Sequence, residues 1–294
     1  MPAASEWDEL IGQVVALTRE HAIEHFVALY AWGGALAGET DPWSDLDVCL
    51  VQADAAGQDS DAAKDWKLSI SDEFEPRVDP SAVLMGQLGT DAHWRYAGYP
   101  WGLLRTGRLL LGDDIRGRIA EPTPRKLCLS TVSLAFLCLR RLYAISRDKP
   151  MPDPLPPLDL RLARCMPAPG NVAWQIVTSL LQGLRALLAL DGVFVGTKRQ
   201  IGPALLQAGR PELAEWCDRV QALRKTVPRT DDMDGVDVVD EIPPPVQPFA
   251  EALPGLLHLL LAEMSSRGLK DPSFEAKEGG SFYRPDGTPT EESK

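Results

Sequence analysis

The chain has 294 residues, of which 45% are hydrophobic and 24% charged, and this ordinary composition excludes a mainly disordered or fibrous protein. At this length two domains are expected. The net charge of −12 disfavours extended contact with nucleic acid, whose phosphates bind basic surfaces. An acidic protein would instead attract a cationic small molecule, or the charge simply keeps the protein in solution.

The cysteines and the apolar runs favour a cytoplasmic protein. The five cysteines are widely spaced and never form a CxxC pair, so we expect neither a zinc site nor a disulfide framework. Acidic residues interrupt the N-terminal segment, which therefore does not resemble a signal peptide. The longest apolar runs are shorter than a membrane span, and we expect no contact with a membrane.

The first part of the chain is typical of a small α/β domain. Apolar residues at helical spacing predict a helix over residues 5–22. The segment HFVALYAW, residues 25–32, is rich in β-favouring residues and stops at Gly33 and Gly34, which predicts a strand and then a tight turn. The alternating segment DLDVCLV, residues 45–51, predicts a second strand.

A third strand is expected within residues 75–85, after an acidic loop. Pro80 lacks the amide hydrogen that a central strand needs, so it indicates an edge strand or a bend. The segment LLRTGRLLLGDD, residues 103–114, indicates the end of a helix and a short apolar segment. The Pro-flanked segment that follows closes a first domain, which we place at residues 1–121.

The rest of the chain is predicted to be helical. A helix of more than twenty residues is expected from Thr123, a possible cap, with Pro124 just inside it, and a proline-rich connector follows. Asn171 can cap a second long helix that ends near Gly192. Further helices are expected near residues 200–226 and 246–266.

Two polar segments interrupt or follow these helices. The acidic segment 229–241 lacks the spacing of a calcium loop and is expected to be solvated. The tail over residues 271–294 is polar and contains Gly and Pro, which predicts disorder. The helical domain is therefore predicted to span residues 122–270.

Two aspartates of the second predicted strand indicate a chemical site. Residues two apart on a strand face the same way, so Asp45 and Asp47 are expected on one face while Leu46 and Val48 enter the core. Two carboxylates side by side repel each other unless a cation lies between them. Mg²⁺ takes oxygen ligands and is commonly held by one or two carboxylates together with substrate phosphates.

The glycine turn before this strand suits a phosphate group. Gly33 and Gly34 have no Cβ, so backbone N–H groups can approach phosphate oxygens closely. Ser44 can donate a hydrogen bond to a phosphate or orient Asp45, or it is simply a turn residue. Together these residues predict a site for a metal and a phosphorylated substrate.

This arrangement resembles the nucleotidyltransferase superfamily, which has the DNA polymerase beta-like fold and includes the aminoglycoside nucleotidyltransferases. The family motif is a hydrophobic residue with Gly-Gly or Gly-Ser, a spacer, and two acidic residues alternating with hydrophobic ones; here it reads WGG, ALAGETDPWS and DLDV. With Gly34 in the serine position, the fuller form Gly-Ser-x-x-x-Gly and Ser-Asp-x-Asp is met by Gly33, Gly38, Ser44, Asp45 and Asp47. An arginine is common before the second glycine, but Ala37 stands here, so phosphate contact at that point would rely on the backbone.

The resemblance implies an α/β (α+β) nucleotidyltransferase domain with a short mixed sheet, followed by an all-helical C-terminal domain that closes the cleft. Family members carry a third carboxylate on a later strand, and Asp79 is the candidate, with Glu75 in reserve; Asp79 could equally form a turn with the following proline. The segment DGVFVGTKRQIGPALLQAG is similar to a loop of the streptomycin/spectinomycin adenylyltransferases. That likeness makes Lys198 a candidate contact of the triphosphate, unless it only begins a helix on its solvent face.

The implied reaction transfers a nucleoside monophosphate from an NTP, with ATP expected, to a hydroxyl and releases pyrophosphate. Two Mg²⁺ ions would bridge the triphosphate and the carboxylates of Asp45, Asp47 and Asp79. A small aminoglycoside-like acceptor, and with it antibiotic resistance, is expected because the chain is acidic and shows no basic surface for RNA. The alternatives are antitoxin-type adenylylation of a protein and a non-catalytic binding or regulatory protein on the same fold. No oligomeric state follows from the sequence.

Overall fold

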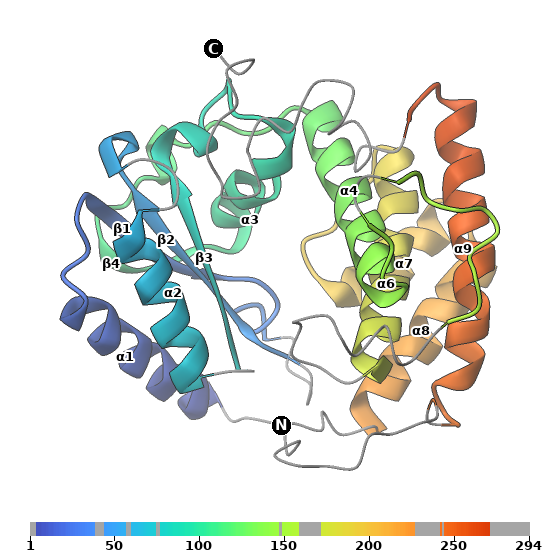
Figure 1. The fold of residues 1–294 in the computed structure, drawn as a ribbon, viewed down its shortest axis with the longest axis horizontal. Coiled ribbons are helices and arrows are strands. Elements are labelled where there is room, and N and C mark those ends of the chain that lie inside the picture. Colours follow the sequence, from blue (N-terminus) through green and yellow to red (C-terminus); the bar gives the residue numbers. More distant parts are fainter. Residues whose placement is uncertain are drawn as a thin grey trace. The chain divides into compact units, whose positions relative to one another are not determined.

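The computed structural model describes residues 4–38, 44–56, 60–74, 77–146, 149–158, 172–226, 242 and 244–270. The chain divides into two compact units, Met1–Leu127 and Cys128–Lys294. In its described part, the first unit holds a sheet with its helices and the second consists of helices and their connections (Figure 1). The fold class is therefore the one implied by the sequence, an α/β domain followed by a helical part.

Four strands of the first unit form one mixed sheet. In chain order they are β1 (Phe26–Trp32), β2 (Leu46–Gln52), β3 (Val78–Leu84) and β4 (Arg108–Gly112), and their spatial order is β3-β2-β1-β4. β1 runs antiparallel to β2 and β4, whereas β2 and β3 are parallel. Pro80 lies in β3 at the edge of the sheet, so its missing amide hydrogen leaves no gap between two inner strands.

The helices α1 (Ala4–Glu20) and α2 (Asp61–Phe74) pack on one face of the sheet (Figure 1). Trp66 of α2 is completely buried there, and its indole Nε1 donates a hydrogen bond of 2.9 Å to Oγ1 of Thr18 in α1. Leu46 and Val48 of β2 point into the same core, as the alternation of the sequence predicts. A shared apolar core and a buried polar contact thus join both helices to this face.

The opposite face is covered by α3 (Gly98–Thr106), whose Leu103 packs in a second core with alternate strand residues. Tyr30 of β1 is completely buried in this core. Its hydroxyl accepts a hydrogen bond of 2.8 Å from the N–H of Ile115 and donates one of 3.0 Å to Oδ1 of Asp114. These bonds satisfy the hydroxyl and fix the chain that follows β4.

Two elements of the first unit differ from the sequence expectation. The sequence indicates an acidic loop before the third strand, but residues 61–74 form α2. The parallel pairing of β2 and β3 requires a crossover connection, and α2 supplies it. β4 is indicated by the sequence only as a short apolar segment, and it becomes a strand because it pairs with β1.

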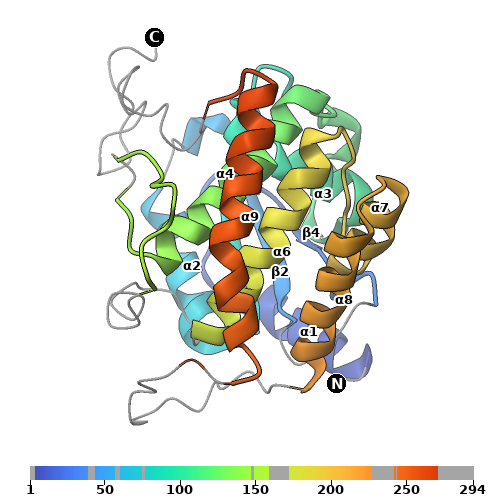
Figure 2. The same ribbon diagram turned by 90° about the vertical axis from the view of Figure 1, so that its right-hand side faces the viewer.

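The second unit is built around α6 (Val172–Leu190). The chain leaves the first unit through α4 (Pro124–Leu142), and α7 (Ile201–Gln207), α8 (Pro211–Thr226) and α9 (Gln247–Ser266) follow α6. α6 and α9 lie side by side (Figure 2), and a methyl group built on Gly183 of α6 would lie 2.5 Å from the side chain of Leu256. The two helices therefore approach too closely at that point for a larger residue than glycine without repacking.

Charged residues tie the ends of these helices together. Arg210 donates to Asp191 over 2.9 Å and to Glu263 over 3.1 Å, and Arg267 reaches Asp191 over 2.8 Å. Arg267 also pairs with Glu263 one helical turn earlier in α9. The guanidinium groups of Arg267 and Arg210 lower the pKa of Glu263. The network joins the end of α6, the start of α8 and the end of α9.

The expectation that every apolar run is shorter than a membrane span is wrong for one helix. α6 is long and apolar enough to cross a membrane by length and composition. However, 72% of its most apolar window is buried inside the structure, as in the central helix of a soluble protein. One helix of this kind is weak support for a membrane span.

Several predictions concern residues outside the described part of the chain. They are the reserve carboxylate Glu75, the helix cap Asn171, the acidic segment 229–241 and the tail 271–294. These stay predictions from sequence.

Candidate active site

The register of the sheet brings two of the predicted carboxylates together. Asp47 of β2 pairs with Asp79 of the parallel strand β3, and Trp32 of β1 pairs with Asp47 on the other side. Paired residues on neighbouring strands point to the same face. Trp32, Asp47 and Asp79 therefore form one row across the sheet, at the end where β1 stops and β2 and β3 begin.

The carboxylates differ in exposure. Asp79 is exposed and Asp47 is half-buried. Asp45 is also half-buried and lies directly before β2, where the N–H of the next residue, Leu46, donates 2.8 Å to the carbonyl of Arg77 before β3. That hydrogen bond aligns the starts of the two strands. The half-buried Ser44 precedes Asp45 in the chain.

Gly33 makes room for the carboxylate of Asp47. Its φ is +87°, which favours glycine, and a Cβ built on it would lie 2.1 Å from Oδ2 of Asp47. The N–H of Gly33 does not face outward, because it donates 3.2 Å to Oγ1 of Thr106. From the sequence, the missing Cβ of Gly33 is expected to let backbone N–H groups approach a phosphate. In the structure, the carboxylate of Asp47 occupies the space that this Cβ would need.

The residues after Gly33 offer backbone donors. They form a turn in which the N–H of Ala37 donates to the carbonyl of Gly34 over 3.1 Å, and that of Gly38 to Ala35 over 3.3 Å. The N–H groups of Gly34, Ala35 and Leu36 have no acceptor within the part of the chain that is described. Such consecutive donors suit an anion.

An aromatic pair lies next to the row of carboxylates, and sequence analysis missed it. Tyr99 of α3 stacks on Trp32 with ring centroids 5.5 Å apart and 19° between planes. Burial raises the pKa of the Tyr99 hydroxyl, and the nearby Cys49 and Asp79 raise it further. Tyr99 therefore reaches from β1 towards β3 as a neutral phenol. No sequence signal marks it, because its neighbours belong to strands far away in the chain.

Lys198, the predicted contact of the triphosphate, lies in the second unit. It begins a short 3-10 helix, Lys198–Gln200, just before α7. Its carbonyl accepts 2.9 Å from Nε2 of Gln221 in α8, and Gln200 accepts 2.7 Å from the N–H of Gly196. The loop that carries Lys198 is thus held by one hydrogen bond within itself and by one from α8. Its role towards the carboxylates stays a prediction.

The carboxylates offer oxygen ligands for a metal ion. Among the described residues no three His, Cys, Asp or Glu side chains converge on one point. The neighbouring pair Asp47 and Asp79, with Asp45 close in sequence, nevertheless fits Mg²⁺, which retains waters and takes its remaining ligands from substrate phosphates. The donors are all oxygens, as a hard cation requires. A preformed cage of protein ligands is not needed for this ion.

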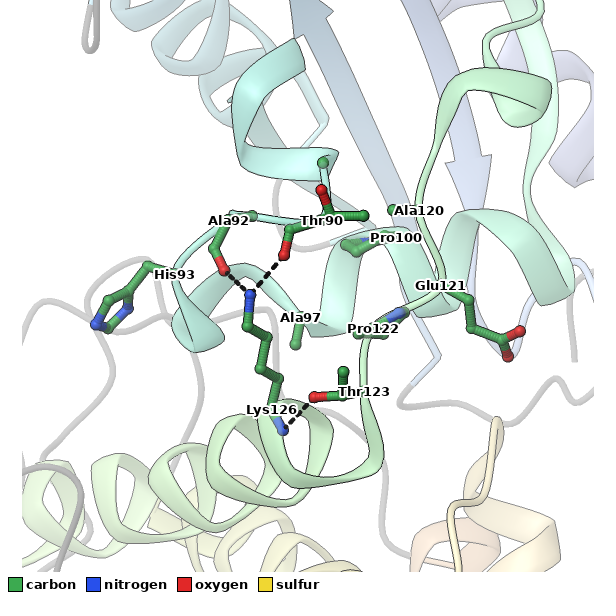
Figure 3. A pocket seen from close by; sticks show the side chains of 11 residues that line it. Thr90, Ala92, His93, Ala97, Pro100, Ala120, Glu121, Pro122, Thr123 and Lys126 are labelled. Atoms are coloured by element: carbon green, nitrogen blue, oxygen red, sulfur yellow. Dashed lines mark hydrogen bonds between the residues drawn. The ribbon is translucent and has the colours of Figure 1, made fainter.

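A small pocket of about 80 Å³ lies elsewhere in the first unit, where the start of α4 meets the loop before α3 (Figure 3). Lys126 crosses it, and its Nζ donates 2.7 Å to the carbonyl of Thr90 and 2.6 Å to that of Ala92. Burial and the charges of Arg95 and Lys126 lower the pKa of His93 at its rim. Because Lys126 already donates to both carbonyls, it holds the first turn of α4 to the loop before α3. The pocket contains none of the predicted site residues.

The described chain has a nucleotidyltransferase fold. It is similar to the crystal structure of spectinomycin adenyltransferase AAD(9) from Enterococcus faecialis with ATP and spectinomycin, with a TM-score of 0.51 and 11% identity over 85% of this chain and 98% of that one. A toxin-antitoxin structure with AMP-PNP has a TM-score of 0.28 and 16% identity over 46% of this chain and 94% of that chain, too weak a likeness to add to the fold. No protein-family model and no curated protein matches the sequence. The resemblance based on the glycine turn and the aspartates is thereby confirmed for the fold.

Proposed function

We propose that this protein transfers a nucleoside monophosphate, AMP from ATP in the expected case, to a hydroxyl of a small acceptor. The acceptor oxygen bonds to the α-phosphorus, the bond to the bridging oxygen of the β-phosphate breaks, and pyrophosphate leaves. The observation that carries the proposal is the pairing of Asp47 with Asp79 beside the turn at Gly33. The carboxylates lie next to backbone N–H groups that have no acceptor among the described residues, on a fold that the chain shares with an adenyltransferase.

Each residue of the candidate site has a distinct role in this proposal. Asp45 and Asp47 would hold Mg²⁺, and Asp79 would either complete that set or, as the exposed member, accept the proton of the acceptor hydroxyl. Bound Mg²⁺ would neutralise charge on the triphosphate and favour its in-line displacement. The N–H groups of Gly34 and its neighbours would hold phosphate oxygens, and Ser44 would add a hydroxyl donor. Lys198 would neutralise the far side of the triphosphate.

The acceptor we favour is cationic and small, such as an aminoglycoside-like compound. The net charge of −12 attracts a cation to the protein. The similar adenyltransferase structure contains ATP and spectinomycin, so this fold can accommodate a small acceptor of that kind. An activity of this kind in the cytoplasm would confer antibiotic resistance. Adenylylation of a protein side chain is the second candidate, and a non-catalytic binding protein is the third.

A labelling experiment separates these possibilities. The purified protein is incubated with α-³²P-labelled NTPs, Mg²⁺ and a panel of aminoglycosides and aminocyclitols, and the products are separated by chromatography and by gel electrophoresis. A labelled small molecule supports the favoured acceptor, and a labelled protein band supports the second candidate. Asp47→Asn removes metal-binding charge from a half-buried, polar position, so it should abolish labelling while circular dichroism and melting temperature stay close to those of the unsubstituted protein. Undiminished labelling by this variant would refute the metal role.

A further inference from the structure

One hydroxyl connects α3 to the glycine turn. Oγ1 of Thr106, the last residue of α3, accepts the N–H of Gly33 over 3.2 Å and donates to the carbonyl of Gly102 over 3.2 Å. The donated proton goes to the helix, so the lone pairs of the hydroxyl are directed at the turn. The hydroxyl of the half-buried Thr106 therefore acts both as a donor and as an acceptor within the protein.

The end of α3 is built to lie close to the end of β1. A methyl group on Gly102 would lie 1.9 Å from Cε3 of Trp32, so the indole rests directly on the helix backbone. Trp32 is also stacked on Tyr99 of the same helix. The residue before Gly33 is thus fixed by packing and Gly33 itself by a hydrogen bond, which leaves little freedom at the point where the turn begins.

The position of Gly33 in turn limits that of Asp47. Oδ2 of Asp47 occupies the place in which a side chain of residue 33 would stand. If Gly33 rotated or moved, the space that Oδ2 of Asp47 occupies would change, and with it the position open to the carboxylate. A chain of contacts therefore runs from the Thr106 hydroxyl through the Gly33 N–H to the carboxylate of Asp47.

We propose that Thr106 is a positioning residue of the active site, which holds the glycine turn so that the carboxylate of Asp47 is placed to bind the metal. The inference rests on the proposed function for its catalytic meaning. It assigns no contact with substrate to Thr106, whose hydroxyl is engaged by Gly33 and Gly102. Its effect is transmitted through the backbone, so the hydroxyl matters and the methyl group of the threonine does not.

The matched variants are Thr106→Val, which replaces the hydroxyl by a methyl group of similar volume, and Thr106→Ser, which keeps the hydroxyl. In Thr106→Val the Gly33 N–H loses its acceptor. We expect metal binding, followed by electron paramagnetic resonance of Mn²⁺ in the presence of ATP, to weaken about tenfold or more, and kcat to fall by about tenfold to a hundredfold, because small misplacements of catalytic groups have effects of that size. Thr106→Ser should keep the Mn²⁺ affinity and kcat close to those of the unsubstituted protein. The KM of the acceptor should change little in either variant.

A readout that needs no catalysis tests the structural link by itself. Selective ¹⁵N labelling of the 24 glycines allows amide exchange at Gly33 to be followed by NMR. We expect slow exchange at Gly33 in the unsubstituted protein and in Thr106→Ser, and faster exchange in Thr106→Val, with Gly102 and Gly107 as internal references in α3 and just after it. Unchanged exchange at Gly33 in Thr106→Val would overturn the inference, as would equal losses in the Val and Ser variants. If the unsubstituted protein neither labels an acceptor nor binds Mn²⁺ with ATP, the proposed function fails, and the exchange data still decide whether Thr106 holds the turn.

Discussion

Replacing Gly33 by alanine should disable the carboxylate site at a modest cost in stability. The residue has a φ of +87°, and a non-glycine residue there costs roughly 1–2 kcal/mol. For a chain of this size such a loss lowers the melting temperature by about 2–4 °C per kcal/mol. The new methyl group would stand 2.1 Å from Oδ2 of Asp47, whereas real Cβ contacts stay above 3.0 Å, so the carboxylate must move away by at least 0.9 Å. A misplacement of about 1 Å at a reacting centre costs about a hundredfold in rate.

Gly38 provides a matched control for this substitution. It also has a positive φ, +72°, but a Cβ built on it meets no atom of the described residues within 4 Å. Gly38→Ala should therefore lower the melting temperature about as much as Gly33→Ala and leave the position of Asp47 unchanged. The assays are nucleotidyl transfer, Mn²⁺ binding in the presence of ATP, and calorimetric melting. Equal activity and equal metal affinity in the two variants would refute the idea that a side chain at position 33 displaces the carboxylate of Asp47.

Two further predictions concern Lys198 and Asp114. Lys198→Ala should raise the KM for the NTP by roughly tenfold to a hundredfold if the lost contact with the triphosphate is worth about 1.4–2.8 kcal/mol, and steady-state kinetics with an unchanged KM would contradict that role. The guanidinium of Arg116 holds the pKa of Asp114 well below its ordinary value of 3.8. A depressed carboxyl pKa stabilises the folded state above the ordinary value, and this contribution is lost as the pH falls below it, so Asp114→Asn should flatten the decline of melting temperature with pH in that acidic range. An equally steep decline in the variant would show that this pair does not contribute.

The sequence determined those features that depend on short stretches of chain. The alternation in DLDVCLV places Leu46 and Val48 in the core, and the strand and turn around Gly33 follow from local composition. The proline in β3 indicates an edge position because a residue without an amide hydrogen cannot donate a ladder hydrogen bond in any sheet. The spacing of the glycines and aspartates was also sufficient to indicate the nucleotidyltransferase fold.

Only the tertiary structure decided which distant residues share the site. The pairing of Asp47 with Asp79 depends on the register of two parallel strands, which α2 and the buried faces of the sheet establish together. Thr106 and Tyr99 lie in a helix whose own pattern indicates nothing beyond an apolar face, and they gain their positions from the way α3 packs on β1. A hydrogen bond between residues 33 and 106 leaves no trace in either local segment, because hydroxyls and glycines are common and only three-dimensional packing brings this pair within 3.2 Å.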